Sequence, residues 1–267
     1  MSVAQRLLGL FQPGERTVRN VAAAALQRSL MPDQLPPIPG LTLAARYIPA
    51  DGDLGGDWYD VFVLPNGSVG LVMGDVMGHG FASAVIMGRL RSSLRSYALE
   101  HDDPADVLRR LDRKIEHFEP GAMATILYGV MAPPYDVIRF SSAGHFPPAI
   151  AAPGCPAALA AIPPDLPMGV GAEHARRTTE LALPPGAALC LYTDGLVEQR
   201  PRSSASAGTL DQQLARLAGD LSADEPEAVV QRIVAQLPDP DRPDDDVAVL
   251  VLRRSADQPA PVSRPTA

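Results

Sequence analysis

The sequence predicts an α+β domain in which β-sheets pack together and helices cover their outer faces. Three observations support this prediction. The turn Pro-Asn-Gly-Ser at 65–68 separates two apolar runs, as in a β-hairpin. Helical patterns follow at about 81–100 and 104–118, and further strand-like runs come directly after them. Strand hairpins interrupted by a pair of helices are typical of α+β domains.

The expected elements run in the following order. A helix at about 15–31 leads into the proline-rich linker 31–40. Pro104 suits the first turn of the helix at 104–118. The predicted strands lie at 41–49, 58–65, 69–76, 123–132, 137–144, 147–152, 176–183, 187–195 and 247–254, and two more helices lie near 209–219 and 225–236. We therefore expect an N-terminal helix and linker at 1–40, a domain at 41–253 and a disordered, proline-rich tail at 254–267.

Composition limits the class of protein. A chain of 267 residues suggests a single domain, and its net charge of -8 argues against nucleic acid as the main partner. We find no apolar run long enough to span a bilayer and no secretory leader at the N-terminus. Cys155 and Cys190 are the only cysteines, which suits a reducing compartment. We expect a cytoplasmic protein without a membrane segment.

Four aspartates at strand ends are the main functional signal. Asp57 and Asp75 follow or precede glycines, Asp194 precedes Gly195, and Asp245 lies within an acidic run. Each of them alone is also explained as a turn former that accepts backbone hydrogen bonds. Together they predict a cation site, because converging carboxylates repel one another unless a cation neutralises them.

An all-oxygen ligand set favours Mg²⁺ or Mn²⁺ over zinc, and no pair of Cys or His residues at zinc spacing competes. Neighbouring glycines would let the backbone approach the ions, so that a peptide carbonyl can also serve as a ligand. These glycines are at positions 55, 56, 74, 78, 80 and 195.

Five motifs in this order resemble a known family: GGDWYD, GDVMGHG, SAGHFPP, LYTDGLVE and DDDVAVLVL. They are similar to the metal-dependent protein serine/threonine phosphatases of the PPM class, in the bacterial SpoIIE/RsbU-type branch. The resemblance runs from about Leu41 to Arg253. It implies a four-layer α-β-β-α sandwich of two mainly antiparallel sheets, with two Mn²⁺ or Mg²⁺ ions at one end of the paired sheets.

The resemblance also implies a role for each motif residue. Asp75 would bridge both metals, and the backbone carbonyl of Val76 would bind one of them. Asp194 and Asp245 would hold the other metal, although Asp244 or Asp246 could take the place of Asp245. Asp57 would bind the second ion directly or through water. The paired metals would activate a water molecule for in-line attack on a phosphoserine or phosphothreonine, without a protein nucleophile.

Two histidines are further candidates. His79 follows the bridging carboxylate and is predicted to protonate the leaving oxygen or hold a water molecule, with a turn histidine bonded to backbone as the alternative. His145, in SAGHFPP, either touches the site or only fixes its turn.

The resemblance implies a substrate and a form of regulation. Members of this branch typically dephosphorylate a small anti-sigma-factor antagonist of the STAS type. The N-terminal helix could pack on its own domain, form a homodimer or connect to an upstream sensor, and our hypothesis is that residues 15–40 carry control. The main alternative function is an inactive phosphatase-like module that binds a partner protein.

Overall fold

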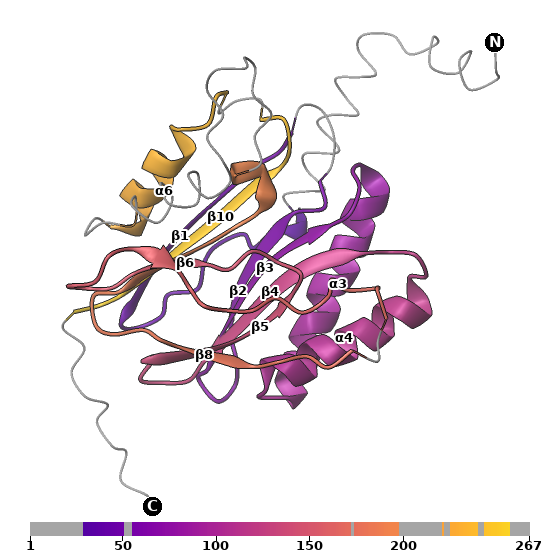
Figure 1. Cartoon of the computed structure of the whole chain (residues 1–267), viewed down its shortest axis with the longest axis horizontal. Helices are drawn as coiled ribbons and strands as arrows, with labels where there is room; N and C mark the ends of the chain where they lie inside the picture. Colours follow the sequence, from indigo (N-terminus) through magenta and orange to yellow (C-terminus); the bar gives the residue numbers. More distant parts are fainter. Residues whose placement is uncertain are drawn as a thin grey trace, which may run out of the picture.

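The computed structural model describes residues 29–50, 55–171, 174–197, 221, 225–239 and 243–256, and it contains two five-stranded antiparallel sheets (Figure 1). The first sheet has the order β1 (Leu41–Ile48), β10 (Val247–Arg254), β9 (Ala188–Tyr192), β6 (Ala149–Ala151) and β7 (Ala158–Leu159). The second has the order β2 (Trp58–Val63), β3 (Val69–Val76), β4 (Ala124–Met131), β5 (Val137–Ala143) and β8 (Thr179–Ala182).

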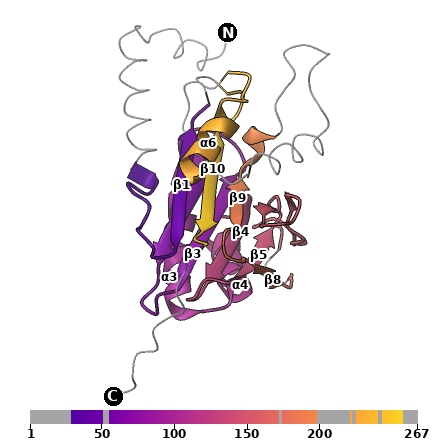
Figure 2. The same ribbon diagram turned by 90° about the vertical axis from the view of Figure 1, so that its left-hand side faces the viewer.

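Helices cover both outer faces. Helices α3 (Phe81–Glu100) and α4 (Pro104–Phe118) pack on the second sheet, and α6 (Pro226–Val234) packs on β1 and β10 of the first sheet. Figures 1 and 2 show the resulting order of layers, from α6 through the two sheets to α3 and α4. The predicted four-layer α-β-β-α sandwich is confirmed.

Strand β3 shows why the sequence forms these layers. Leu71 and Met73 pack in the core between the two sheets, whereas Val72 and Val76 pack against the helices on the other face. A strand that is buried on both faces needs apolar residues at consecutive positions, which explains the unbroken apolar run before the glycine turn. Asp75 is the one residue of β3 that is not fully buried.

One partly buried and one fully buried ion pair join the helices to the rest of the domain. Asp60 of β2 is almost fully buried, and it binds Arg95 of α3 through two hydrogen bonds of 2.6 Å. Asp112 of α4 pairs with Arg176, and both side chains are 1% exposed. Gly169 also donates its backbone N–H to Asp112, over 3.3 Å. The connection between β7 and β8 is thereby fastened to α4.

Several predicted boundaries differ from the structure. The short strand β7 was not predicted, because its two residues lie in a segment rich in Pro and Ala. The predicted strand at 176–183 is only Thr179–Ala182, since Arg176 and Arg177 point into ion pairs. Arg254 belongs to β10, at the start of the range assigned to the tail.

Other predictions lie partly or wholly outside the described residues. The predicted helix at 209–219 is wholly outside, and so are residues 15–28 and 257–267. Ser29 and Leu30 are helical, as expected for the end of the N-terminal helix. Within the described part of the chain, no helix combines the length and the apolar character needed to cross a bilayer.

Candidate metal centre

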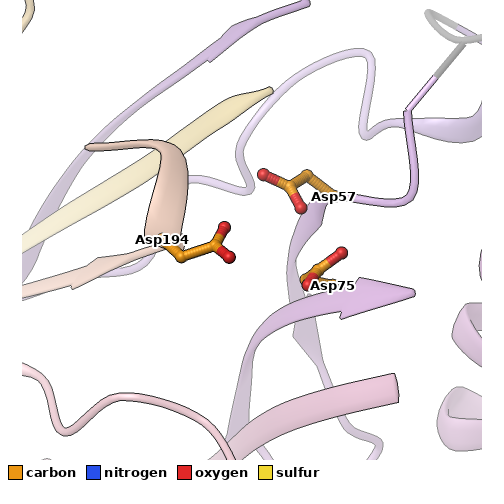
Figure 3. A group of neighbouring side chains, drawn as sticks. All are labelled: Asp57, Asp75 and Asp194. Carbon is orange, nitrogen blue, oxygen red and sulfur yellow. The ribbon is translucent and has the colours of Figure 1, made fainter. Parts of the chain in front are cut away.

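Three of the four predicted carboxylates meet at one end of the sandwich. Asp57, Asp75 and Asp194 each offer a carboxylate oxygen, and these three oxygens lie within 4.8 Å of one another. Figure 3 shows their side chains pointing toward a common space, with Asp57 and Asp75 on one side and Asp194 on the other. The cluster therefore draws its carboxylates from both sheets.

Strand pairing explains this meeting. Trp58 of β2 pairs with Gly74 of β3, so the next step of the antiparallel register brings Asp57 opposite Asp75. Asp194 comes from the first sheet, where it begins the short 3₁₀ helix η1 (Asp194–Leu196) directly after β9. Residues far apart in the sequence thus converge, because the site ends of β2 and β3 in the second sheet face the end of β9 in the first.

The carboxylates perturb one another strongly. Burial raises the pKa of Asp57 well above its usual range, and the charges of Asp75 and Asp246 raise it further. Burial also raises the pKa of Asp75 to about 6, with the charge of Asp194 as the next cause. Mutual repulsion of this kind is relieved either by a proton or by a cation.

The residues fit a divalent cation. Asp57 Oδ2 is buried and has no hydrogen-bond partner among the described residues, so a buried acceptor oxygen is left unsatisfied. A cation placed between the three carboxylates would satisfy that oxygen and neutralise the cluster. The donor set consists of oxygen atoms only, which Mg²⁺ and Mn²⁺ prefer.

The carbonyl of Val76 lies against Gly56 at the edge of this cluster. A Cβ atom built on Gly56 would come within 2.2 Å of the Val76 oxygen, so no larger residue fits without moving this carbonyl. Val76 also donates its N–H to the Gly56 carbonyl over 3.2 Å. The two glycine-rich motifs are thus packed backbone to backbone beside Asp57 and Asp75. A metal bond to the Val76 carbonyl stays a prediction.

Asp245, the fourth predicted ligand, is exposed and is not one of the three residues whose oxygens lie within 4.8 Å of one another. Its Oδ1 accepts the backbone N–H of Asp246 over 2.8 Å. A Cβ atom on Gly195 would lie 3.3 Å from the Asp245 Cβ and 2.1 Å from the Asp246 carbonyl oxygen. The acidic run therefore packs directly on the turn that carries Asp194, and a ligand role for Asp245 stays a prediction.

Asp246 is buried, unlike its exposed neighbours Asp244 and Asp245. Its carboxylate is buried, and Oδ1 accepts the backbone N–H of Ala50 over 2.7 Å. A Cβ atom on Gly55 would fall 1.3 Å from Asp246 Oδ2 and 2.6 Å from the Tyr47 hydroxyl. Asp246 thus fastens the segment between β1 and β2 to the start of β10, while Asp244 is exposed.

The two candidate histidines lie in contrasting surroundings. His79 is exposed on the turn between β3 and α3, four residues after Asp75. His145 is 3% exposed and is hydrogen-bonded on both ring nitrogens, to Thr125 and to the carbonyl of Tyr192. Burial lowers its pKa to about 4, so the ring is neutral near pH 7. His145 is therefore a buried, neutral residue that is hydrogen-bonded to both sheets beside the site.

Two threonines of the site were missed by the sequence analysis. Buried Thr193, next to Asp194, accepts the N–H of Ala248 on its hydroxyl over 2.8 Å and so joins β9 to β10. Thr125 is the strand partner of Asp75 in β4. Thr193 lies in the motif LYTDGLVE and Thr125 in the predicted strand 123–132, but their role depends on pairing between strands, which no local pattern records.

Comparison with known proteins agrees with this geometry. Residues 65–255 match the family model described as Stage II sporulation protein E (SpoIIE). Phosphoserine phosphatase RsbU of Bacillus subtilis is 25% identical over 179 residues, which cover 67% of this chain and 53% of RsbU. The chain spans between 32% and 53% of the length of the curated relatives it matches.

Solved structures give the same result. The RsbU and RsbW domains of a Mycobacterium tuberculosis protein are 27% identical and superpose with a TM-score of 0.72, covering 86% of this chain and 64% of that one. The SiaA-PP2C domain of Pseudomonas aeruginosa has the same fold, with a TM-score of 0.72 at 20% identity, over 95% of this chain and 99% of that domain. The resemblance indicated by the five motifs is confirmed, and the chain belongs to the SpoIIE family.

Proposed function

We propose that this protein is a metal-dependent protein serine/threonine phosphatase that hydrolyses a phosphoserine or phosphothreonine monoester. The observation that carries the proposal is the meeting of Asp57, Asp75 and Asp194 from two different sheets. Its relative RsbU is a phosphoserine phosphatase, which supports the same reaction class. An inactive scaffold would have no reason to keep three carboxylates converging on one point, where their charges repel one another.

In this proposal the residues of the chain hold and orient the reacting groups. Asp75, Asp57 and Asp194 hold two Mn²⁺ or Mg²⁺ ions, with Asp245 and the Val76 carbonyl completing the ligand set. The bound metals supply positive charge for the phosphoryl oxygens and lower the pKa of the attacking water. In this proposal His79, which is exposed four residues after Asp75, protonates the leaving serine oxygen.

The proposed substrate is a phosphorylated anti-sigma-factor antagonist with a STAS fold. Membership of the SpoIIE family and similarity to RsbU support this choice. Such a protein would present a phosphoserine on its surface to the open end of the sandwich. The reaction would release inorganic phosphate and restore the serine hydroxyl.

A phosphate-release assay tests the proposal. The probe is a purified STAS-domain antagonist phosphorylated on serine by its kinase, with a phosphotyrosine peptide as the comparison substrate. We expect phosphate release that requires added Mn²⁺ or Mg²⁺, stops with EDTA, and is at least about tenfold faster on the phosphoserine protein. Stable binding of the antagonist without any release would instead support the inactive regulatory module.

We further propose that residues 15–40 pass a regulatory signal to the domain, through an upstream sensor, a partner protein or a homodimer. Leu30 lines a groove of about 650 Å³ between α3 and α4, and it packs on Gly88 of α3. The N-terminal segment thus enters the described structure beside the helix that follows the Asp75 turn. A variant lacking residues 1–35 with unchanged activity and oligomeric state would rule this out.

A further inference from the structure

We propose that His145 is a positioning residue that fixes the spacing between Asp75 and Asp194 by joining the two sheets. It follows β5 at the site end of the second sheet, and its ring is buried between that sheet and the first. The inference concerns the metal-binding step of the proposed function. It assigns a task to the one buried histidine whose role the sequence left open.

Both ring nitrogens of His145 are engaged, and each faces a different sheet. Nδ1 lies 2.8 Å from the hydroxyl of Thr125 in β4, and Nε2 lies 3.0 Å from the carbonyl oxygen of Tyr192 in β9. A carbonyl oxygen only accepts, so Nε2 carries the hydrogen and donates. In a neutral ring Nδ1 then accepts from the Thr125 hydroxyl, and one tautomer satisfies both bonds.

The two partners are immediate neighbours of the predicted metal ligands. Thr125 is the residue of β4 that pairs with Asp75 in the register of β3 and β4. Tyr192 ends β9, and Asp194 follows it by two residues. A shift of either hydrogen bond would therefore move one carboxylate relative to the other.

The backbone around His145 is itself held in place. The Ser142 hydroxyl donates to the His145 carbonyl over 3.0 Å. The ring of Phe146 stacks on Tyr192 at a centroid distance of 6.1 Å, and the Tyr192 hydroxyl donates to the Pro147 carbonyl over 3.0 Å. The segment that carries His145 is thus docked on the same strand that its ring binds.

Directional bonds are needed here because the hydrophobic core between the sheets does not by itself fix the positions of the metal ligands. The inter-sheet core consists of residues such as Leu71, Leu189 and Leu250, and their packing favours burial without fixing a hydrogen-bond distance. Some residues orient metal ligands without binding the metal themselves. Replacing such a residue typically lowers metal affinity or activity by about 10–100-fold. We expect an effect of this size from His145.

The test uses two measurements. The first is Mn²⁺ affinity, obtained from the electron paramagnetic resonance signal of the free ion, and the second is the unfolding midpoint of the metal-free protein. Thr125→Val removes the hydroxyl at nearly constant shape, and Thr125→Ser is its matched control because it keeps the hydroxyl. His145→Phe removes both ring hydrogen bonds, and His145→Gln restores a donor of similar reach. All four are made in the full chain.

We expect Thr125→Val and His145→Phe each to weaken Mn²⁺ binding by about 10–100-fold, with Thr125→Ser close to wild type and His145→Gln in between. The double variant Thr125→Val/His145→Phe should bind Mn²⁺ no more weakly than His145→Phe alone, since both changes break one network. A residue with a merely structural role would lower the unfolding midpoint and leave the Mn²⁺ affinity of the folded protein unchanged.

Two results would overturn the positioning role, and a third would contradict the proposed function. Mn²⁺ affinity that stays at the wild-type value in both Thr125→Val and His145→Phe would overturn the positioning role. An equal loss in Thr125→Val and Thr125→Ser would also overturn it, because the hydroxyl is then irrelevant. Failure of the wild-type protein itself to bind Mn²⁺ would contradict the proposed function instead.

Discussion

Asp75→Asn is expected to lower Mn²⁺-dependent phosphate ester hydrolysis by about 10³-fold or more. Asp75 is one of the three carboxylates of the cluster, opposite Asp194 and beside Asp57, and an amide in its place cannot carry the negative charge that holds cations there. Losing about 4 kcal/mol of metal-derived stabilisation of the transition state corresponds to this factor. Initial rates with an aryl phosphate, measured across a range of Mn²⁺ concentrations, give the value.

Asp136→Asn is the matched control for this substitution. It makes the same chemical change at an exposed position next to β5, outside the carboxylate cluster. We expect its rate to stay within about twofold of wild type. Equal activity in Asp75→Asn and Asp136→Asn would contradict the assignment of Asp75 to the metal centre.

Arg176→Met is expected to lower the free energy of unfolding by about 3–5 kcal/mol, because it leaves the buried carboxylate of Asp112 without its cation. Arg176 donates to Asp112 through Nε over 2.8 Å and also through Nη2, and it donates to the carbonyl of Leu166. All of these bonds lie where the connection from β7 to β8 packs against α4. Urea unfolding followed by the fluorescence of buried Trp58 measures the loss.

Two further variants show whether the cost comes from an unpaired charge. Arg46→Met removes an exposed ion pair with Glu227, and we expect a loss below about 1 kcal/mol. The double variant Asp112→Leu/Arg176→Met removes both charges, and it should be more stable than Arg176→Met alone. A single variant as stable as wild type would show that this pair does not hold the loop to α4.

Local patterns in the sequence predicted most of the fold. The turn at Asn66 and Gly67 predicted the β2–β3 hairpin, and the apolar run after it predicted the strand that the structure shows as β3. Asp103 and Pro104 marked the start of α4, and Asp103 does accept the N–H of Ala105, over 2.8 Å. Each of these signals lies within a few residues of the feature that it specifies.

Features that depend on distant contacts were beyond the sequence. Asp112 and Arg176 are 64 positions apart, and nothing in either segment indicates the other. The three consecutive aspartates at 244–246 look alike in the sequence, and only the pairing of Val247 with Ile48 shows that Asp246 turns toward the segment after β1. His145 is a similar case, because its two partners belong to different sheets.

The candidate site was predictable to the extent that its members share one local signature. Asp57, Asp75 and Asp194 each stand beside a glycine at or next to one end of a predicted strand, and the structure brings these three together. Asp245 carries the same type of side chain, but it is exposed and lies outside this cluster of three. Motif spacing alone does not distinguish these two arrangements.

The central claim is that Asp57, Asp75 and Asp194 form a metal centre shared by the two sheets. Diffraction from crystals grown with Mn²⁺, recorded near the manganese absorption edge, tests it most directly. We predict anomalous density between these three carboxylates in the wild-type protein and its loss in Asp75→Asn. Saturating Mn²⁺ that leaves this space without anomalous density, while the ion binds elsewhere, would contradict the claim.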